Sequence, residues 1–141
     1  MNKLLTLVFC ALATLGYTQS QWQSGFLRTD GLKEMEGVEV YYQNTECQGK
    51  QVAIMKVINN NAYPVELRWY NDFYDNDFEI IKREQSGNKA SQLQVAAGAT
   101  VVGNCQSNHP LVIPVQEELG NQLPQFHFVF FADYEIRRAG P

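Results

Sequence analysis

Short runs of alternating apolar and polar residues, separated by turn residues, extend along most of the chain. In residues 65–70, the apolar side chains of Val65, Leu67 and Trp69 occupy every second position. The longest such run spans residues 126–136, whereas the 3.6-residue periodicity of helices is nearly absent. Period-2 alternation is typical of antiparallel strands that bury one face, so we expect a β protein with Trp69 in its core.

The same pattern predicts further strands and the turns that connect them. The predicted strands cover residues 38–42, 52–58, 65–70, 79–84, 93–96, 100–103, 111–113 and 126–136. Turns are expected at residues 59–61, 86–88 and 97–99, and one helical turn at residues 116–120, ended by Gly120. About eight strands at this spacing favour an immunoglobulin-like antiparallel β-sandwich, with a small barrel as the alternative.

Two segments support the sandwich. The segment Val52–Trp69 resembles adjoining strands of immunoglobulin-like exported domains. It consists of an apolar strand, an Asn-rich turn, Tyr63-Pro64 and an alternating strand. Leu93–Thr100 resembles their strand-turn-strand passage around a glycine. The chain departs from antibody-type domains, because Cys47 precedes its apolar strand and Gly103 stands where the tyrosine corner would place Tyr. The resemblance therefore implies an architecture and no particular activity.

The N-terminus has the pattern of a cleavable export signal. Lys3 supplies a positive charge, an apolar run follows from Leu4 to Gly16, and the small residues Gly16, Thr18 and Ser20 provide a cleavage zone where the chain becomes polar. The run is shorter than the roughly 20 apolar residues of a membrane-spanning helix. We therefore expect a signal peptide at 1–20, a partly ordered extension at 21–36, one domain at 37–137, a frayed tail at 138–141, and no integral membrane segment after cleavage.

Cys10 offers an alternative, because a cysteine after an apolar segment can become the acylated first residue of a lipoprotein. Phe9, a large residue, stands directly before it where such sites normally have a small one. Removal of Cys10 with the signal leaves Cys47 and Cys105, which we expect to form a disulfide in an oxidising compartment.

The charge balance excludes one class of partner. After removal of the signal the chain carries 10 basic and 15 acidic residues, a net charge of −5. Its basic residues are not clustered beyond the pairs 82–83 and 137–138. Nucleic-acid binding requires clustered positive charge, so a nucleic-acid partner is not expected.

Residues 70–79 combine aromatic and acidic side chains, and they are the most promising candidate ligand-binding segment. Exposed rings can bind a sugar or a protein partner. Oxygen-rich loops can bind calcium, but Ile80 and Ser86 stand where an EF-hand loop requires glycine and glutamate. An irregular calcium site and a solvated acidic loop both remain open. The candidate ligand-binding residues are Tyr70, Asp72, Phe73, Tyr74, Asp75 and Asp77.

The motifs of enzymes are weak or missing. Ser86 and Lys89 have the Ser-x-x-Lys spacing of a serine nucleophile and its base, but the companion motifs do not occur, and a plain turn explains the tetrapeptide. His109 and His127 lack the spacing of zinc ligands. We therefore expect no catalytic residues, no metal site and no cofactor.

Together these features predict a non-enzymatic protein that is secreted or periplasmic. It would act by surface contact, as an accessory or binding module of the cell envelope or secretome. The alternative is a carbohydrate- or calcium-binding module that uses the loop at residues 70–79. The partner would be an envelope or surface protein, or a glycan.

Overall fold

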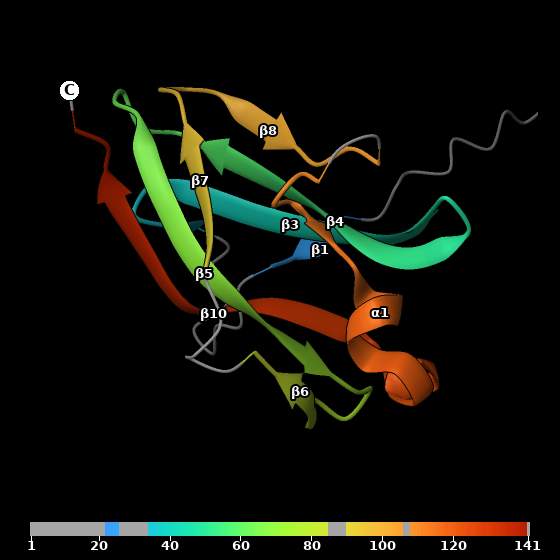
Figure 1. Cartoon of the computed structure of the whole chain (residues 1–141). Coiled ribbons are helices and arrows are strands. Elements are labelled where there is room, and N and C mark those ends of the chain that lie inside the picture. Colours follow the sequence, from blue (N-terminus) through green and yellow to red (C-terminus); the bar gives the residue numbers. More distant parts are fainter. Residues whose placement is uncertain (1–21, 26–33, 85–89, 106–107, 141) are drawn as a thin grey trace, which may run out of the picture.

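The chain folds into two antiparallel β-sheets that pack face to face (Figure 1). The computed structural model describes residues 22–25, 34–84, 90–105 and 108–140. The predicted signal peptide at 1–20 and the pair Ser86 and Lys89 lie outside the described residues. The all-β prediction and the sandwich arrangement of two antiparallel sheets are confirmed.

The first sheet is built on the long hairpin of β3 (Val38–Cys47) and β4 (Lys50–Asn59), which pair along their whole length. Its strand order is β1-β3-β4-β8 in the described part of the chain, and β2 and β9 pair with β3 and β4 respectively. The shorter strands are β1 (Gln23–Ser24), β2 (Glu34–Met35), β8 (Thr100–Val102) and β9 (Val112–Ile113).

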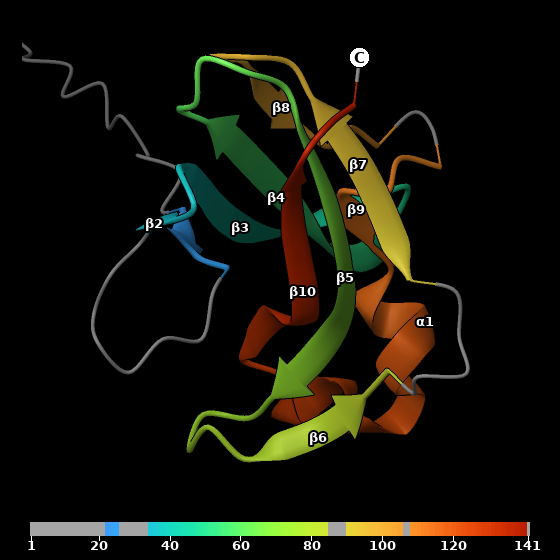
Figure 2. The same ribbon diagram turned by 90° about the vertical axis from the view of Figure 1, so that its left-hand side faces the viewer.

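The second sheet has the order β10-β5-β6, with β7 beside the other half of β5 (Figure 2). β5 (Val65–Tyr74) pairs with β10 (Phe128–Arg138), the red strand of Figure 2, and with β6 (Ile80–Arg83) and β7 (Ser91–Val95). A β-bulge interrupts the pairing of β10 between Ala132 and Glu135. The extra residue shifts the alternation of the backbone by one position. A different set of alternate residues therefore points its N–H and C=O groups toward β5 after the bulge than before it.

The turn between β3 and β4 has only two residues, Gln48 and Gly49. Their φ angles are +53° and +77°. A two-residue hairpin with both φ angles positive matches the right-handed twist of the strands, and glycine adopts that conformation without steric cost. This turn sets the register that places the apolar residues of both strands on the inner face.

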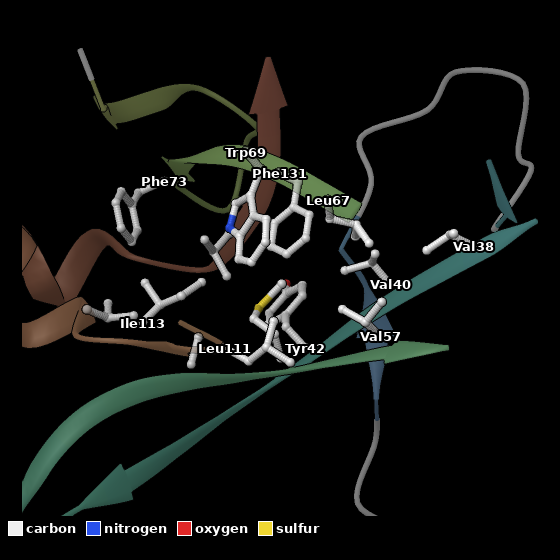
Figure 3. Packing of buried hydrophobic residues seen from close by; sticks show 14 of the residues in the cluster. Val38, Val40, Tyr42, Val57, Leu67, Trp69, Phe73, Leu111, Ile113 and Phe131 are labelled. Atoms are coloured by element: carbon white, nitrogen blue, oxygen red, sulfur yellow. The ribbon is translucent and has the colours of Figure 1, made fainter. Parts of the chain in front are cut away.

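The core fills the space between the sheets (Figure 3). Trp69 is completely buried and stacks on Phe131, with ring centroids 4.4 Å apart and planes at 15°, which confirms the predicted core position of Trp69. Apolar residues at alternate positions of facing strands supply most of this core, as the period-2 pattern predicts. The largest fully buried side chains include Tyr42, Met55, Leu67, Trp69, Phe73, Leu111 and Ile113.

One end of the sandwich is closed by a disulfide and two helical segments. Cys47 at the end of β3 is bonded to Cys105, with Cα atoms 5.4 Å apart, so the predicted disulfide is confirmed. α1 (Val115–Leu119) buries Val115 and Leu119 and continues into the 3-10 helix at Gly120–Gln125. In the described residues, no helix has the length and apolar character needed to cross a membrane.

The strand boundaries differ most from the expected ones at β3, which continues to Cys47 beyond the expected 38–42, and at the ends of β5 and β10. β5 continues to Tyr74, four residues beyond the point where the alternation ends. Arg138 belongs to β10 rather than to a frayed tail, and its guanidinium lies over the ring of Tyr63, 4.7 Å from the centroid. The N–H of Ala139 donates to the carbonyl of Pro64 at 2.9 Å, which continues the pairing past the last strand residue.

Candidate functional site

The turn that joins β5 to β6 is held by the carboxylate of Asp75. Its Oδ1 accepts hydrogen bonds from the N–H groups of Asp77 and Glu79, both at 2.9 Å. The N–H of Asp75 donates to the carbonyl of Glu79 at 2.9 Å. An aspartate that accepts backbone hydrogen bonds in this way substitutes for part of the strand ladder and fixes the turn.

Phe78 stands out from this turn. Its φ angle is +60°, a conformation that costs a residue with a Cβ atom about 1 kcal/mol or more. Its ring lies parallel to that of Phe128, with centroids 4.4 Å apart and planes at 6°. The residue nevertheless leaves 56% of its surface exposed. The turn therefore holds one face of a large ring against β10 and leaves the rest accessible.

The neighbouring residues extend this arrangement over three strands. Phe128, Tyr74 and Ile80 are direct partners in the registers of β10, β5 and β6, and therefore lie on the same outer face. The ring of Phe130 lies 6.0 Å from Phe128, nearly parallel to it, and 5.4 Å from Tyr74. Ile80 is 46% exposed. We call Phe78, Ile80 and Phe128, lying over the buried rings of Tyr74 and Phe130, the hairpin-end aromatic surface.

A fixed cation lies beside this surface. Arg83 Nε donates to Asp72 Oδ2 at 3.1 Å, and the Asp72 side chain is only 4% exposed whereas that of Arg83 is 61% exposed. The hydrogen bond from Arg83 to Asp72, followed by the charge of Asp72, raises the pKa of Arg83 above its usual value, and Tyr74 adds to this shift. Because the buried carboxylate holds one edge of the guanidinium, the rest of this cationic group faces solvent next to the aromatic rings.

Three of the candidate residues are covered in the folded protein. Asp72, Phe73 and Tyr74 are buried, with 3%, 0% and 7% of their surface exposed, so they do not form an accessible surface in this structure. Phe73 faces the core, and Asp72 and Tyr74 are covered on the outer face by Arg83 and Phe130. β5 continues through these residues with both faces covered, which removes the alternation that would have revealed a strand.

The other three candidates keep some access to solvent. Tyr70 is half-buried on β5, Asp75 is half-buried in the turn, and Asp77 is exposed. The structure brings Asp75 and Asp77 together through the turn, but Asp75 uses its carboxylate to hold the backbone. In the described part of the chain, no group of three or more His, Cys, Asp and Glu side chains is arranged to hold a metal ion. Binding of a ligand by Tyr70, Asp75 and Asp77 stays a prediction.

Sequence reasoning missed four site residues: Phe78, Ile80, Arg83 and Phe128. The signal for Phe128 was present, because it belongs to the alternating run that was assigned to a strand. The sequence could not show that Phe78 stacks on Phe128, because this contact depends on the pairing of β10 with β5. His127, the other residue noted near this position, is exposed and lies edge-on to Phe128 at 5.2 Å.

An open cavity of about 610 Å³ lies beside the disulfide. It is lined by both cysteines and by the ion pair of Lys50 and Glu117, whose Nζ and Oε1 atoms are 2.6 Å apart. His109 also borders it, and its Nδ1 accepts the N–H of Leu111 at 3.1 Å, so the proton of the neutral ring lies on Nε2. The charged groups on the rim satisfy one another, and the described residues of this lining present no nucleophile paired with a base.

The fold defines the chain as a disulfide-bonded antiparallel β-sandwich protein with an exposed aromatic surface at one end of its second sheet. No protein-family model matches the chain, and no curated protein matches it. Among solved structures, the chain is similar to a DUF1425 family member from Shewanella sp. pv-4. The two are 13% identical, with a TM-score of 0.41 over 74% of this chain and 80% of the other. A likeness of this degree assigns no family.

Proposed function

We propose that this chain is an exported, non-enzymatic binding module that acts by surface contact through the hairpin-end aromatic surface. One observation carries the proposal: Phe78 exposes 56% of its surface while its backbone is fixed at φ +60° and its ring is stacked on Phe128. A large apolar side chain that is exposed and already ordered loses little conformational entropy on binding. Such residues are typical of the centres of protein interfaces.

The surroundings of Phe78 suit a protein partner. Ile80 adds a second exposed apolar side chain, and Arg83 supplies a charged group at the edge that is already oriented by Asp72. An apolar centre with a polar margin is the usual anatomy of a specific protein interface, and aromatic and arginine residues are enriched there. A partner that presents an apolar pocket and a carboxylate would fit both features.

Export is part of the proposal. The apolar run near the N-terminus supports it, and so does the disulfide, since disulfides persist in oxidising compartments outside the cytosol. The intact mass of the protein recovered from the periplasm or the medium tests it. A mature chain that begins close to residue 21 supports export with cleavage, and a full-length chain confined to the cytosol contradicts it.

Site-specific photo-crosslinking in the native host tests the binding surface. A photoreactive phenylalanine analogue at position 78 should capture a discrete partner, and the product should be lost when Ile80→Ser is added. The matched control places the analogue at Gln94, an exposed residue of the same sheet. Equal products at both positions, or no product at position 78, would contradict the proposed surface.

A carbohydrate ligand is the second candidate. Asn76 and Asp77 are exposed beside the accessible ring of Phe78, which places hydrogen-bonding groups next to an aromatic face. A glycan panel, with calcium titration alongside, decides this alternative. Binding that is lost in both Phe78→Ser and Asp77→Ala supports it, and silence in both assays rejects it.

A further inference from the structure

β10 forms an edge of the second sheet, because its described pairing partner within that sheet is β5 alone. On the other side of β10, the N–H of Phe131 donates to the carbonyl of Gly25 at 2.9 Å. The following residues, 135–138, lie beyond the β-bulge and form the last regular stretch of the strand. Among the described residues, β5 pairs with this stretch on one side, and the other side is an edge.

The direction of the backbone groups along this stretch follows from two bonds. The N–H of Ala139 donates to Pro64 across the ladder, in the same register that pairs Arg137 with Glu66. Backbone groups of an antiparallel strand point alternately to the two sides. Arg137 and Glu135 therefore point their backbone groups toward β5, whereas Ile136 points its N–H and C=O away from β5.

The side chains on this stretch carry alternating charge. Glu135 and Arg137 are both exposed, and they lie on the outer face of the sheet opposite Arg68 and Glu66. Arg137 is bonded to Glu66 at 2.7 Å, with 65% of its side chain exposed. In the sequence Glu135-Ile136-Arg137, an acid and a base therefore flank a residue whose backbone N–H and C=O groups point away from β5.

We propose that this edge pairs with β10 of a second copy of the chain, antiparallel and symmetric about Ile136. In that register the two Ile136 residues exchange N–H to C=O bonds, and Glu135 of each copy lies directly opposite Arg137 of the other. These flanking positions are the non-hydrogen-bonded pairs of the ladder, where opposing side chains approach most closely. The two charge pairs are identical by symmetry, as a two-fold interface requires.

The charges of β5 strengthen this register. Each Arg137 would lie between Glu66 of its own chain and Glu135 of the second copy, so that acid and base alternate across the joined sheet. Like charges directly opposite one another are destabilising, whereas unlike charges stabilise the pair. A register that placed Glu135 opposite Glu135 would lose this alternation.

Charge reversal gives a test with an internal control. Glu135→Arg and Arg137→Glu should each weaken self-association in sedimentation velocity, on the order of tenfold or more in Kd, since each reverses two pairs at once. An equimolar mixture of the two variants should restore association, because arginines at positions 135 and 137 of one variant then face glutamates at positions 137 and 135 of the other. The double variant should also restore it. Thr100→Arg, which adds positive charge at an exposed position of the first sheet, should have no effect.

Hydrogen exchange reports the backbone part of the proposal. The amide of Ile136 should exchange more slowly at high protein concentration than at low concentration in the wild type, and this difference should vanish in Glu135→Arg. A wild-type chain that stays monomeric at all concentrations overturns the proposal and leaves the edge to another partner. A dimer that is indifferent to both reversals, or variants whose mixture does not associate, overturns it equally.

Discussion

The ring of Phe78 lies flat against that of Phe128, with 4.4 Å between their centroids, although the two residues are far apart in the sequence and meet only through the folded sheet. The stack positions an exposed ring at a turn whose backbone is held by Asp75. The positive φ of Phe78 shows that this position opposes the local preference of the residue.

Two substitutions of Phe78 distinguish the energetic cost of its backbone conformation from the contribution of its ring contact. We expect Phe78→Gly to be more stable than Phe78→Ala by about 1 kcal/mol, because both lose the ring and only glycine adopts φ +60° without cost. Urea unfolding of the two variants measures the difference. If alanine proved equal to or more stable than glycine, the positive φ would not be a feature of the folded protein.

Asn59 should be among the most sensitive polar residues of the described chain. It is completely buried, its Nδ2 donates to the carbonyls of Tyr63 at 2.9 Å and Ala96 at 3.1 Å, and its Oδ1 accepts from the N–H of Asn61 at 3.0 Å. Asn59→Ala should lower the free energy of unfolding by about 1–3 kcal/mol, since it removes the amide donor to the carbonyl of Tyr63 and the acceptor of the N–H of Asn61.

Asn59→Asp should cost more, because a buried carboxylate would face the same carbonyl oxygens. The control is Asn60→Ala, since Asn60 is an exposed neighbour and that substitution should change stability by less than about 0.5 kcal/mol. Denaturant titration distinguishes the three variants. Equal effects of Asn59→Ala and Asn60→Ala would contradict the role assigned to the buried amide.

The disulfide should contribute a large part of the stability. Cys47 and Cys105 are 58 residues apart, and closing a loop of this length stabilises by about 4 kcal/mol in the chain-entropy account. The double variant Cys47→Ala, Cys105→Ala should lose a comparable amount in urea unfolding, and added reductant should affect only the wild type. A reductant effect on the double variant would show that another process is being measured.

Stability should fall in alkaline solution through Tyr42. Burial raises the pKa of Tyr42 to about 12 from its usual value of 10.0. The phenol is protonated in both states below pH 10, but between about pH 10 and 12 the unfolded chain loses the proton while the folded one keeps it. The unfolded state then binds fewer protons, so stability decreases as pH rises.

Tyr42→Phe should flatten this decrease, as measured by urea unfolding at several alkaline pH values. Tyr41, whose pKa is also raised to about 12, first by its hydrogen bond to Glu39, provides a comparison outside the core. A wild type whose stability does not change between pH 10 and 12 would contradict the assignment.

Much of the scaffold was accessible from the chain itself. The alternating run around Leu67 and Trp69 and the long run through Phe128 and Phe130 predicted β5 and β10, which pair with each other in the second sheet. The two cysteines that remain once Cys10 is removed with the predicted signal peptide predicted the disulfide. These features are local or compositional, so no knowledge of neighbouring strands was needed to predict them.

The candidate site was harder to predict from the sequence, and Tyr74 shows why. Its place beside acidic residues suggested an accessible ring. In the structure it is covered by Phe130 of β10, a strand that is far from Tyr74 in the sequence. Phe78 belonged to the same aromatic segment but was not among the predicted site residues, and it is the ring that faces solvent. Alternation indicates which side chains share a face of one strand, and it says nothing about what another strand lays over that face.

By itself the order of residues determined the longer strands, the turns at residues 59–61 and 97–99, and the sulfur atoms available for a bridge, because strands and turns depend on local backbone preference and on the period of apolar positions. Only the tertiary structure decided that Asp72 and Tyr74 are covered, that Phe78 is stacked and exposed, and that Ile136 directs its backbone away from β5. Those properties arise from strand pairing and register, which bring together residues that are far apart in the sequence.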